Sequence, residues 1–289
     1  MSHIAATFRR LHSNATPLLL PNAWDAGSAR LFENQGATAV ATTSAGVAWA
    51  LGYRDGRLLP INEVVAAVSR MARVLTVPLS VDIENGYSDD PLVVADHVKR
   101  LIDLGIAGIN IEDGPDKVEL LTSKIEAIRD AVVTVGADLF INARSDVYLA
   151  RLVERSKLVE ESIARGRVYA GAGADGFFLP GIAHPQDIEA VVGGVALPLN
   201  VMAWPGLSGA TELGKLGVRR LSAGSGISQV LWGNAAALAR DFMKSGRSGP
   251  LSEAAMPYAE LQKLFPERSV SIPLHVAFSP ERPNAFPAQ

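Results

Sequence analysis

Residues 77–105 read VPLSVDIENGYSDDPLVVADHVKRLIDLG and decide the fold. The apolar, β-branched run Val77–Asp82 is typical of a buried strand. After a polar turn, apolar residues recur three and four positions apart from Leu92 to Leu104, which is the spacing of an amphipathic helix. Two aspartates before Pro91 are typical of a helix start, and Gly105 is typical of a helix end. This stretch therefore predicts a strand followed directly by a helix.

Seven further apolar runs occur along the chain, and the eight runs lie about 29 residues apart on average. They are Leu18–Pro21, Thr38–Thr42, Ile106–Glu112, Asp138–Ala143, Gly176–Leu179, Leu197–Met202 and Val218–Ser222. Several are continuously apolar, as expected when helices cover one face of a parallel sheet and a packed core covers the other. Eight strands alternating with helices favour a (β/α)8 TIM barrel. The first run is followed by NAWDAGSAR rather than a Gly-x-Gly-x-x-Gly loop, which disfavours a dinucleotide-binding fold.

The length and composition are consistent with one large domain and a short extension. The chain has 289 residues, and a single barrel of about 250 residues accounts for most of it. After residue 246 the composition shifts toward proline, which excludes one continuous helix. We predict a barrel over residues 1–246 and a C-terminal extension over residues 247–289. The extension should hold a short helix near Tyr258–Phe265 and an extended arm able to pack on a neighbouring subunit.

Composition also excludes several functional classes. Cysteine is absent, which excludes disulfides, cysteine-bound zinc, iron-sulfur clusters and thiolate nucleophiles. The net charge of -3 gives no electrostatic footprint for nucleic acid or for an anionic membrane. The first residues lack the apolar core and cleavage site of a secretory signal, so the default expectation is a cytoplasmic protein.

Polar side chains stand at the ends of successive apolar runs. In barrels the active site lies at the C-terminal ends of the strands, so these residues are candidates for chemistry. The second run is followed by the turn Thr43-Ser44-Ala45-Gly46, the third ends in Asp82 with Glu84 two residues on, the fourth ends in Glu112 and Asp113, and Arg144 follows the fifth. We expect four carboxylates and one guanidinium to face a common rim.

The carboxylates of Asp82 and Glu84 suggest a metal site. The two residues are two positions apart in what should be extended chain, so both side chains would point the same way and could share one cation. Hard oxygen ligands without nearby histidine or cysteine favour Mg²⁺, with Mn²⁺ as a second choice. The alternative for any one of these carboxylates is a helix cap or an ion pair with lysine or arginine.

Arg144 and the small residues after the second run suggest an anion site. The guanidinium of Arg144 is placed to bind a carboxylate or phosphonate in bidentate fashion. Its alternative is an ion pair with Asp146 or Glu112. The Ser44-Ala45-Gly46 turn offers backbone N–H groups to the same anion, because small residues allow close approach.

Taken together, these stretches resemble the isocitrate lyase and phosphoenolpyruvate mutase superfamily. The similar stretches span roughly residues 17–245 and read LLLPNAWDAGSARLFENQGATAVATTSAG, LGYRDG, SVDIENGY, INIEDG, FINARSDVYL, GADGFFLPG, PLNVM and LGVRRLSAGSG. The resemblance implies a (β/α)8 barrel whose last helix is often exchanged between subunits of a homodimer or homotetramer. It also implies a Mg²⁺-bound 2-oxo carboxylate, or its enolate, as the small-molecule ligand.

By the same resemblance, four acidic residues belong to the metal region. Asp82 is similar to the principal metal-side carboxylate, and Glu84 stands where the family usually has a second aspartate. Glu112 matches the residue that holds metal-bound water. Asp55, in the YRDG turn, matches the acidic residue near the metal and the substrate.

The resemblance also implies which residues hold the substrate. Thr43, Ser44, Ala45 and Gly46 are similar to the loop that binds the substrate carboxylate through backbone amides. Arg144 matches the charged residue that binds the same carboxylate, and Asn200 matches a further polar residue in the wall of the site. These matches imply catalytic roles for Asp55, Arg144 and Glu112.

Two departures from the family narrow the expected activity. Isocitrate and methylisocitrate lyases carry a Lys-Lys-Cys-Gly-His loop whose cysteine acts as an acid, and this chain has no cysteine. Residues 114–123, in the same place, are shorter than the gating loops of phosphoenolpyruvate mutase or phosphonopyruvate hydrolase, and a shorter lid excludes water less completely. We therefore expect a Mg²⁺-dependent lyase that cleaves a C–C bond of a small 2-oxo dicarboxylate or related acid through an enolate-type intermediate. The alternatives are a C–P bond enzyme, similar to phosphonopyruvate hydrolase or phosphoenolpyruvate mutase, and a non-catalytic barrel that binds a metabolite.

Overall fold

Nine parallel strands form the centre of the computed structural model, which describes residues 2–253 and 255–265. The strands are β1 (Leu18–Leu20), β2 (Asn22–Ala23), β3 (Val40–Thr42), β4 (Leu79–Asp82), β5 (Gly108–Glu112), β6 (Phe140–Arg144), β7 (Gly176–Leu179), β8 (Leu199–Met202) and β9 (Val218–Ser222). All eight predicted strands are present. The first predicted run, Leu18–Pro21, forms β1, and the strand is interrupted at Pro21, which has no N–H for the strand ladder, before it continues as β2, a strand not predicted from the sequence.

The order of the strands shows a nearly closed barrel. It runs β1-β9-β8-β7-β6-β5-β4-β3-β2, with every pair parallel. At one edge Leu18 pairs with Arg220, and at the other Asn22 pairs with Ala41. Because only Pro21 separates these two edge strands along the chain, the edges belong to one continuous segment, which closes the ring as a TIM barrel.

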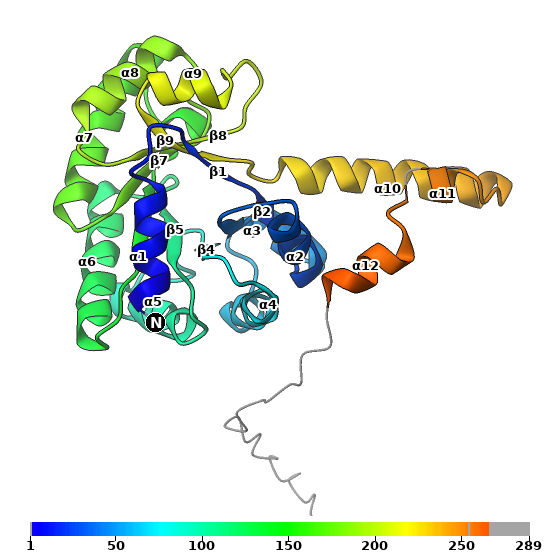
Figure 1. The fold of residues 1–289 in the computed structure, drawn as a ribbon. Helices are drawn as coiled ribbons and strands as arrows, with labels where there is room; N and C mark the ends of the chain where they lie inside the picture. Colours follow the sequence, from blue (N-terminus) through cyan, green and yellow to red (C-terminus); the bar gives the residue numbers. More distant parts are fainter. Residues whose placement is uncertain (1, 254, 266–289) are drawn as a thin grey trace, which may run out of the picture. The chain divides into compact units, whose positions relative to one another are not determined.

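Helices alternate with the strands, as the sequence predicts (Figure 1). They are α1 (Ser2–Leu11), α2 (Ala26–Asn34), α3 (Ser44–Ala50), α4 (Ile61–Val74), α5 (Pro91–Ile102), α6 (Val118–Thr134), α7 (Leu158–Gly171), α8 (Pro185–Gly194), α9 (Ala210–Lys215), α10 (Gly226–Ser245), α11 (Pro250–Glu253) and α12 (Tyr258–Leu264). A π turn, η1 (Val147–Arg151), and a 3₁₀ turn, η2 (Arg155–Lys157), precede α7.

By its contacts the chain divides after Ala255 into two units. The helix expected near Tyr258–Phe265 is present as α12 in the second unit. The expected extended arm falls on residues 266–289 and lies outside the described residues.

Helix α5 shows why the sequence folds as it does. Its N-cap, Asp90, accepts a hydrogen bond from the backbone N–H of Leu92 at 2.9 Å, and Pro91 occupies the first helical position. Val94 and Val98 are fully buried on the face toward the sheet. Burial of each such side chain contributes roughly 1.5–3 kcal/mol, so the apolar stripe fixes which face packs inward.

The barrel interior contains a polar layer. The side-chain amide of Asn142 donates to the side-chain oxygens of Asn110, at 2.9 Å, and Asn200, at 3.0 Å. Arg220 is fully buried and donates to the same Asn110 oxygen at 3.2 Å and to Ser222 Oγ at 3.3 Å. Below this layer, helix α1 inserts the fully buried Phe8 into an apolar cluster with residues of β1 and β6. The interior is therefore filled by side chains at both of these levels.

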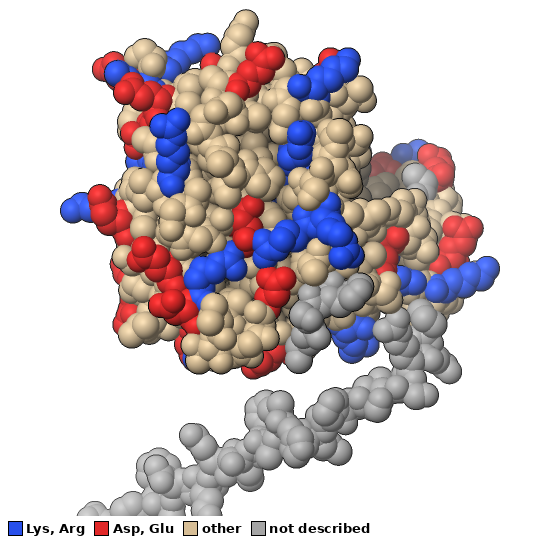
Figure 2. All heavy atoms as spheres, turned by 60° about the vertical axis from the view of Figure 1, so that its left-hand side comes forward, with Lys and Arg blue, Asp and Glu red and all other residues tan. Residues whose placement is uncertain are grey.

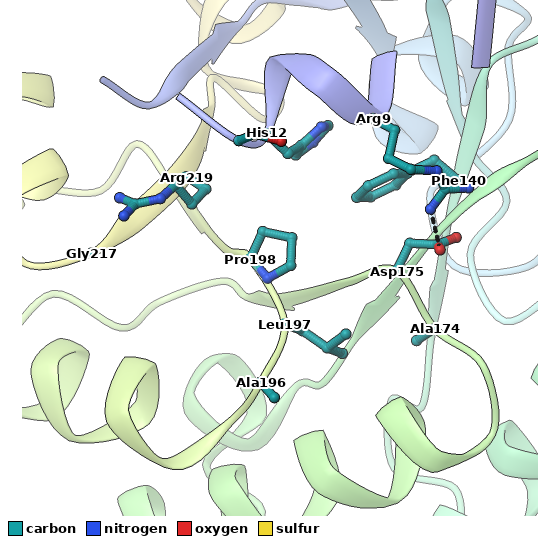
Figure 3. Close-up of a pocket in the computed structure, with 11 residues that line it drawn as sticks. Arg9, His12, Phe140, Ala174, Asp175, Ala196, Leu197, Pro198, Gly217 and Arg219 are labelled. Carbon is teal, nitrogen blue, oxygen red and sulfur yellow. Dashed lines mark hydrogen bonds and ion pairs between the residues drawn. The ribbon is translucent and has the colours of Figure 1, made fainter. Parts of the chain in front are cut away.

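A cavity of about 530 Å³ opens beside α1 at the N-terminal end of the barrel (Figure 3). Arg9 reaches across it to Asp175 and also pairs with Asp138 at 2.9 Å. His12 stacks on the ring of Phe140 with a centroid separation of 4.2 Å. Because its Nδ1 lies 2.8 Å from the carbonyl oxygen of Phe8, this nitrogen carries the proton in the neutral imidazole.

We expect His12 to make the fold sensitive to acid. Burial lowers the pKa of His12 to about 3, and the positive charge of Arg220 contributes further. An unfolded chain binds this proton near pH 6.5, so the stability contribution is complete above that pH and is lost progressively from pH 6.5 toward pH 3. In His12→Phe, the fall in unfolding free energy between pH 7 and pH 4.5 should be smaller by about 2.5 kcal/mol. Urea unfolding of both proteins at the two pH values measures it, and equal falls would contradict the prediction.

Charged residues are interspersed on the face that Figure 2 shows, where Lys and Arg alternate with Asp and Glu. None of the helices in the described ranges combines the length and the apolar character needed to cross a membrane.

Candidate active site

The last residues of three neighbouring strands bring acidic and basic groups together. Asp82 ends β4, Glu112 ends β5 and Arg144 ends β6. The register pairs Glu112 directly with Arg144, and Asp82 with Asn110, two residues before Glu112. These residues meet because parallel strands in register end at the same edge of the sheet.

Arg144 is held by two carboxylates. Its Nη1 lies 2.6 Å from Glu112, while Nε and Nη2 bind the two oxygens of Asp146 at 2.7 and 3.0 Å. The structure thus shows the ion pairs that the sequence left open as an alternative to substrate binding. A guanidinium has five N–H groups, so three are used and two remain for a ligand. The two carboxylates orient Arg144, and an incoming anion can bind the remaining donors.

Glu84 does not continue the strand, so the expectation of extended chain from Asp82 to Glu84 is wrong. The backbone of Glu84 has a φ of 50°, and its N–H donates to Asp82 Oδ1 at 3.0 Å. The Glu84 carboxylate instead accepts a hydrogen bond from the backbone N–H of Arg57 and contacts the Tyr87 hydroxyl. A turn two residues after the strand therefore directs the two carboxylates to different partners.

The acidic residues of this rim repel one another. Burial raises the pKa of Glu84 to about 7, and the charges of Asp82 and Asp55 act in the same direction, against the Arg57 hydrogen bond. Burial also raises the pKa of Asp55, with Asp82 adding to the effect. Burial raises the pKa of Glu112 as well, although Arg144 opposes the shift. The site thus concentrates more negative charge than Arg144 neutralises.

This donor set fits a hard divalent cation held partly by other oxygens. In residues 2–253 and 255–265, no three histidine or acidic side chains are grouped closely enough to hold a metal ion by themselves. Mg²⁺ needs no such cage, because it is commonly bound by one or two carboxylates with water and substrate oxygens completing the shell. Asp82 is the residue that electrostatically links Asp55, Glu84 and Glu112. A cation beside Asp82 would relieve the repulsion within the whole group.

The N-terminus of α3 lies at the same end of the barrel. Thr43 caps this helix, and its Oγ1 accepts a hydrogen bond from the N–H of Gly46 at 3.3 Å. The N–H groups of Ser44 and Ala45 precede the first intrahelical bond and have no partner in the described part of the chain. A Cβ on Gly46 would lie 2.6 Å from Thr43 Cγ2, so the turn has no room for a side chain there. Two amides, rather than three, are thus available to an anion.

Two other predicted polar residues face away from the rim. Asp113 is only 1% exposed and accepts hydrogen bonds from Ser145 Oγ, Arg165 Nη1 and the Tyr169 hydroxyl at 2.7 to 2.9 Å, so the expectation that it faces the rim is wrong. Adjacent residues of a strand point to opposite faces, and its position next to Glu112 could have predicted this. Asn200 lies in the interior polar layer, where Asn142 and residues of β9 bind its side chain.

Sequence reasoning missed the contribution of Arg57. This residue has a φ of 68°, its N–H binds Glu84, and its Nη2 lies 2.8 Å from Asp116 Oδ2. It thereby connects the loop that carries Asp55 with the segment after β5. No sequence signal marks this role, since Arg57 is distant along the chain from both of its partners, Glu84 and Asp116.

Comparisons with known proteins identify the family of the chain. The family model described as phosphoenolpyruvate phosphomutase matches residues 8–243. An uncharacterized protein of Mycobacterium tuberculosis is 39% identical over 261 residues, covering 89% of this chain and 95% of the relative. An oxaloacetate decarboxylase of Paraburkholderia xenovorans is 31% identical over 260 residues, covering 86% and 84%.

Solved structures give the same result. The crystal structure of a candidate phosphonomutase from Burkholderia cenocepacia is similar with a TM-score of 0.78 and 38% identity, covering 82% of this chain and 99% of that one. The family match and the parallel barrel agree. The chain therefore belongs to the phosphoenolpyruvate phosphomutase family, within the isocitrate lyase and phosphoenolpyruvate mutase superfamily of lyases and mutases.

Proposed function

We propose that this protein is a Mg²⁺-dependent lyase that cleaves a C–C bond of a small 2-oxo dicarboxylate or a related acid through an enolate-type intermediate. One observation carries the proposal: the carboxylates of Asp55, Asp82 and Glu112 act on a single guanidinium, that of Arg144, and Glu84 adds a further negative charge beside Asp55 and Asp82. This combination suits a substrate that is itself an anion and binds together with a cation.

In this proposal the acidic residues bind the metal, and the N–H donors bind the substrate. Asp82, with Glu84 and Glu112 nearby, would hold Mg²⁺, which when bound neutralises the charge that develops on the oxygen next to the broken bond. The amides of Ser44 and Ala45 and the two remaining N–H groups of Arg144 bind and orient the substrate carboxylate. Ordering the substrate in this way removes part of the barrier before the bond breaks.

The segment between β5 and α6 favours this reaction over phosphoryl migration. It contains only five residues, 113–117, because β5 ends at Glu112 and α6 begins at Val118. Asp113 is buried and hydrogen-bonded to Ser145, so only residues 114–117 of this segment remain to cover the site. Water therefore has access as a source of the proton that the new carbanion needs, whereas a mutase must retain its intermediate away from water.

The test is product analysis by proton and phosphorus NMR. Purified protein is incubated with oxaloacetate, isocitrate-type acids, phosphonopyruvate and phosphoenolpyruvate, with Mg²⁺ or with EDTA. We expect C–C cleavage of a 2-oxo or related acid that EDTA abolishes. Phosphate or phosphonopyruvate as the product would instead establish the C–P alternative, which the similarity to a candidate phosphonomutase supports. Oxalate binding with no turnover of any compound would indicate a metabolite-binding barrel.

We also propose that two or four copies of the chain associate through α10. Ser228 is its only buried residue in the described part of the chain, while Leu231, Leu238 and Phe242 are 45%, 39% and 49% exposed. These three lie seven and eleven positions apart and therefore share one side of the helix. A second copy, as in the exchange of the last helix that the family resemblance implies, would cover this apolar stripe.

Phe242→Glu should therefore reduce the assembly to monomers. Light scattering of the unaltered protein at micromolar concentration should give at least twice the mass of one chain. Arg240→Glu, on the opposite side of the same helix, serves as the matched control and should leave the mass unchanged. A monomer mass for the unaltered protein would refute the proposal.

A further inference from the structure

A second large cavity lies at the same end of the barrel as the acidic rim. Its volume is about 890 Å³, and it is bounded by the segments that follow β6, β7 and β8. None of its lining residues belongs to the candidate active site, although Tyr148 and Arg151 follow Arg144 and Asp146 along the chain. A volume of this size is in the range of small-molecule sites, commonly about 300–1,000 Å³.

The charge of this cavity is unbalanced toward the positive. Arg151, Arg155 and His184 line it, and its single carboxylate, Asp187, accepts a hydrogen bond from the Tyr148 hydroxyl at 3.1 Å. Neither the Arg151 nor the Arg155 guanidinium has an ion pair or hydrogen bond to any of the residues that the structure describes.

The arginine of the N-terminal cavity is different. Arg9 pairs with Asp175, as Figure 3 shows, and also with Asp138. The second arginine of that cavity, Arg219, donates to the backbone oxygens of Gly214 and Val218. The two free arginines near Asp187 therefore form the stronger candidate for binding an anion.

The backbone holds these basic groups at the cavity at an energetic cost. Arg151 has a φ of 51°, in the left-handed region that glycine or asparagine adopts more readily, and it ends the π turn η1. Such conformations persist only where surrounding structure enforces them, and they are concentrated at functional sites. At the other wall, α8 begins with Pro185 directly after His184, so its unpaired N–H groups add partial positive charge.

An apolar surface completes the cavity. Trp204 is 41% exposed and Leu149 39% exposed, and both line it. The exposed ring of Trp204 lies in a cavity that also contains arginines. Such a surface suits a ligand with a flat or apolar body, whose acidic groups would face the guanidinium groups.

We propose that this cavity is a second binding site, for an organic anion that carries at least two carboxylate or phosphate groups on a flat or apolar body. Arg151 and Arg155 bind the acidic groups, and the body lies against Trp204. The anion is either a separate effector or the distal part of a long substrate, and the chemistry of recognition is the same for both. The proposal does not depend on which bond the acidic rim cleaves.

The probe is isophthalate, a flat dianion, titrated by calorimetry and by tryptophan fluorescence in the absence of metal. We expect saturable binding that Arg155→Met weakens at least about tenfold, because a charge-assisted hydrogen bond is lost while the alkyl stem is kept. Arg70→Met is the matched control, an exposed arginine on α4 outside the cavity, and should leave the affinity unchanged. Trp204→Phe should remove most of the fluorescence change.

A second titration distinguishes the two sources of the anion. With Mg²⁺ and saturating oxalate present, unchanged isophthalate affinity identifies an effector site, whereas competition identifies the distal part of a substrate site. Absence of saturable binding below about 10 mM, or equal affinity in Arg155→Met, overturns the proposal. Because binding is read directly, these results stand even if no substrate of the acidic rim is found.

Discussion

Asp82→Asn should lower turnover of the best substrate by at least about a thousandfold while leaving the fold intact. The substitution removes one negative charge but keeps the oxygen that accepts the hydrogen bond from the Glu84 N–H. Loss of that charge should weaken the proposed Mg²⁺ binding, because Asp82 lies where the acidic groups converge. Steady-state kinetics over a range of Mg²⁺ concentrations, with thermal unfolding alongside, provides the measurement.

Asp89→Asn is the matched control for this prediction. Asp89 is an exposed acidic residue of the same β4–α5 segment, and only a long contact of 3.9 Å joins it to Lys124. Turnover of Asp89→Asn should stay within about twofold of that of the unaltered protein, because the Asp89 side chain is 80% exposed and its long contact is with Lys124 rather than with the rim. Unchanged turnover in Asp82→Asn would refute the metal site and with it the proposed function.

Asp113→Asn should destabilise the protein by about 3 to 5 kcal/mol, the cost of leaving one member of a buried ion pair without its partner. The Asp113 carboxylate accepts hydrogen bonds from Ser145, Arg165, Tyr169 and the backbone N–H of Asp146. An amide would place its own N–H groups against some of these donors. Urea unfolding at pH 7 measures the difference in unfolding free energy.

The same substitution should also reduce activity, because Asp113 fixes the backbone of Asp146, which in turn holds Arg144. Glu161→Gln is the comparison, since Glu161 pairs with Arg165 from a side chain that is 32% exposed. Its cost should stay below about 1 kcal/mol. Equal destabilisation by the two substitutions would show that Asp113 is not the anchor of this segment.

The barrel was predictable because its signal is periodic. Each strand is a compact apolar run, and each helix shows its own spacing and its own end signals, as in α5 with Pro91. Local sequence and tertiary packing agree at these positions, so a residue-by-residue reading gives the correct elements. The division of the first strand also follows from a local cause, the missing N–H of Pro21.

The positions of the site residues were predictable only for those that lie within strands. Asp82, Glu112 and Arg144 are the last residues of their strands, and the structure brings them together. Glu84 lies beyond the end, where contacts with Arg57 and Tyr87 set the backbone. Tyr87 is only three residues away, but Arg57 belongs to a different loop, and a single sequence carries no pattern that reveals that contact.

The pairing of β1 with β9 has a consequence for folding during synthesis on the ribosome. Leu18 and its partner Arg220 are separated by most of the barrel sequence. At translation rates of about 5–20 residues per second, the first strand leaves the ribosome roughly 10 to 40 seconds before its neighbour exists. Over that interval the edge of β1 has no strand to pair with. The ring of strands can close only after β9 has been synthesised. A chain stalled before residue 218 would therefore expose an open sheet edge, which is a target for chaperones and for aggregation.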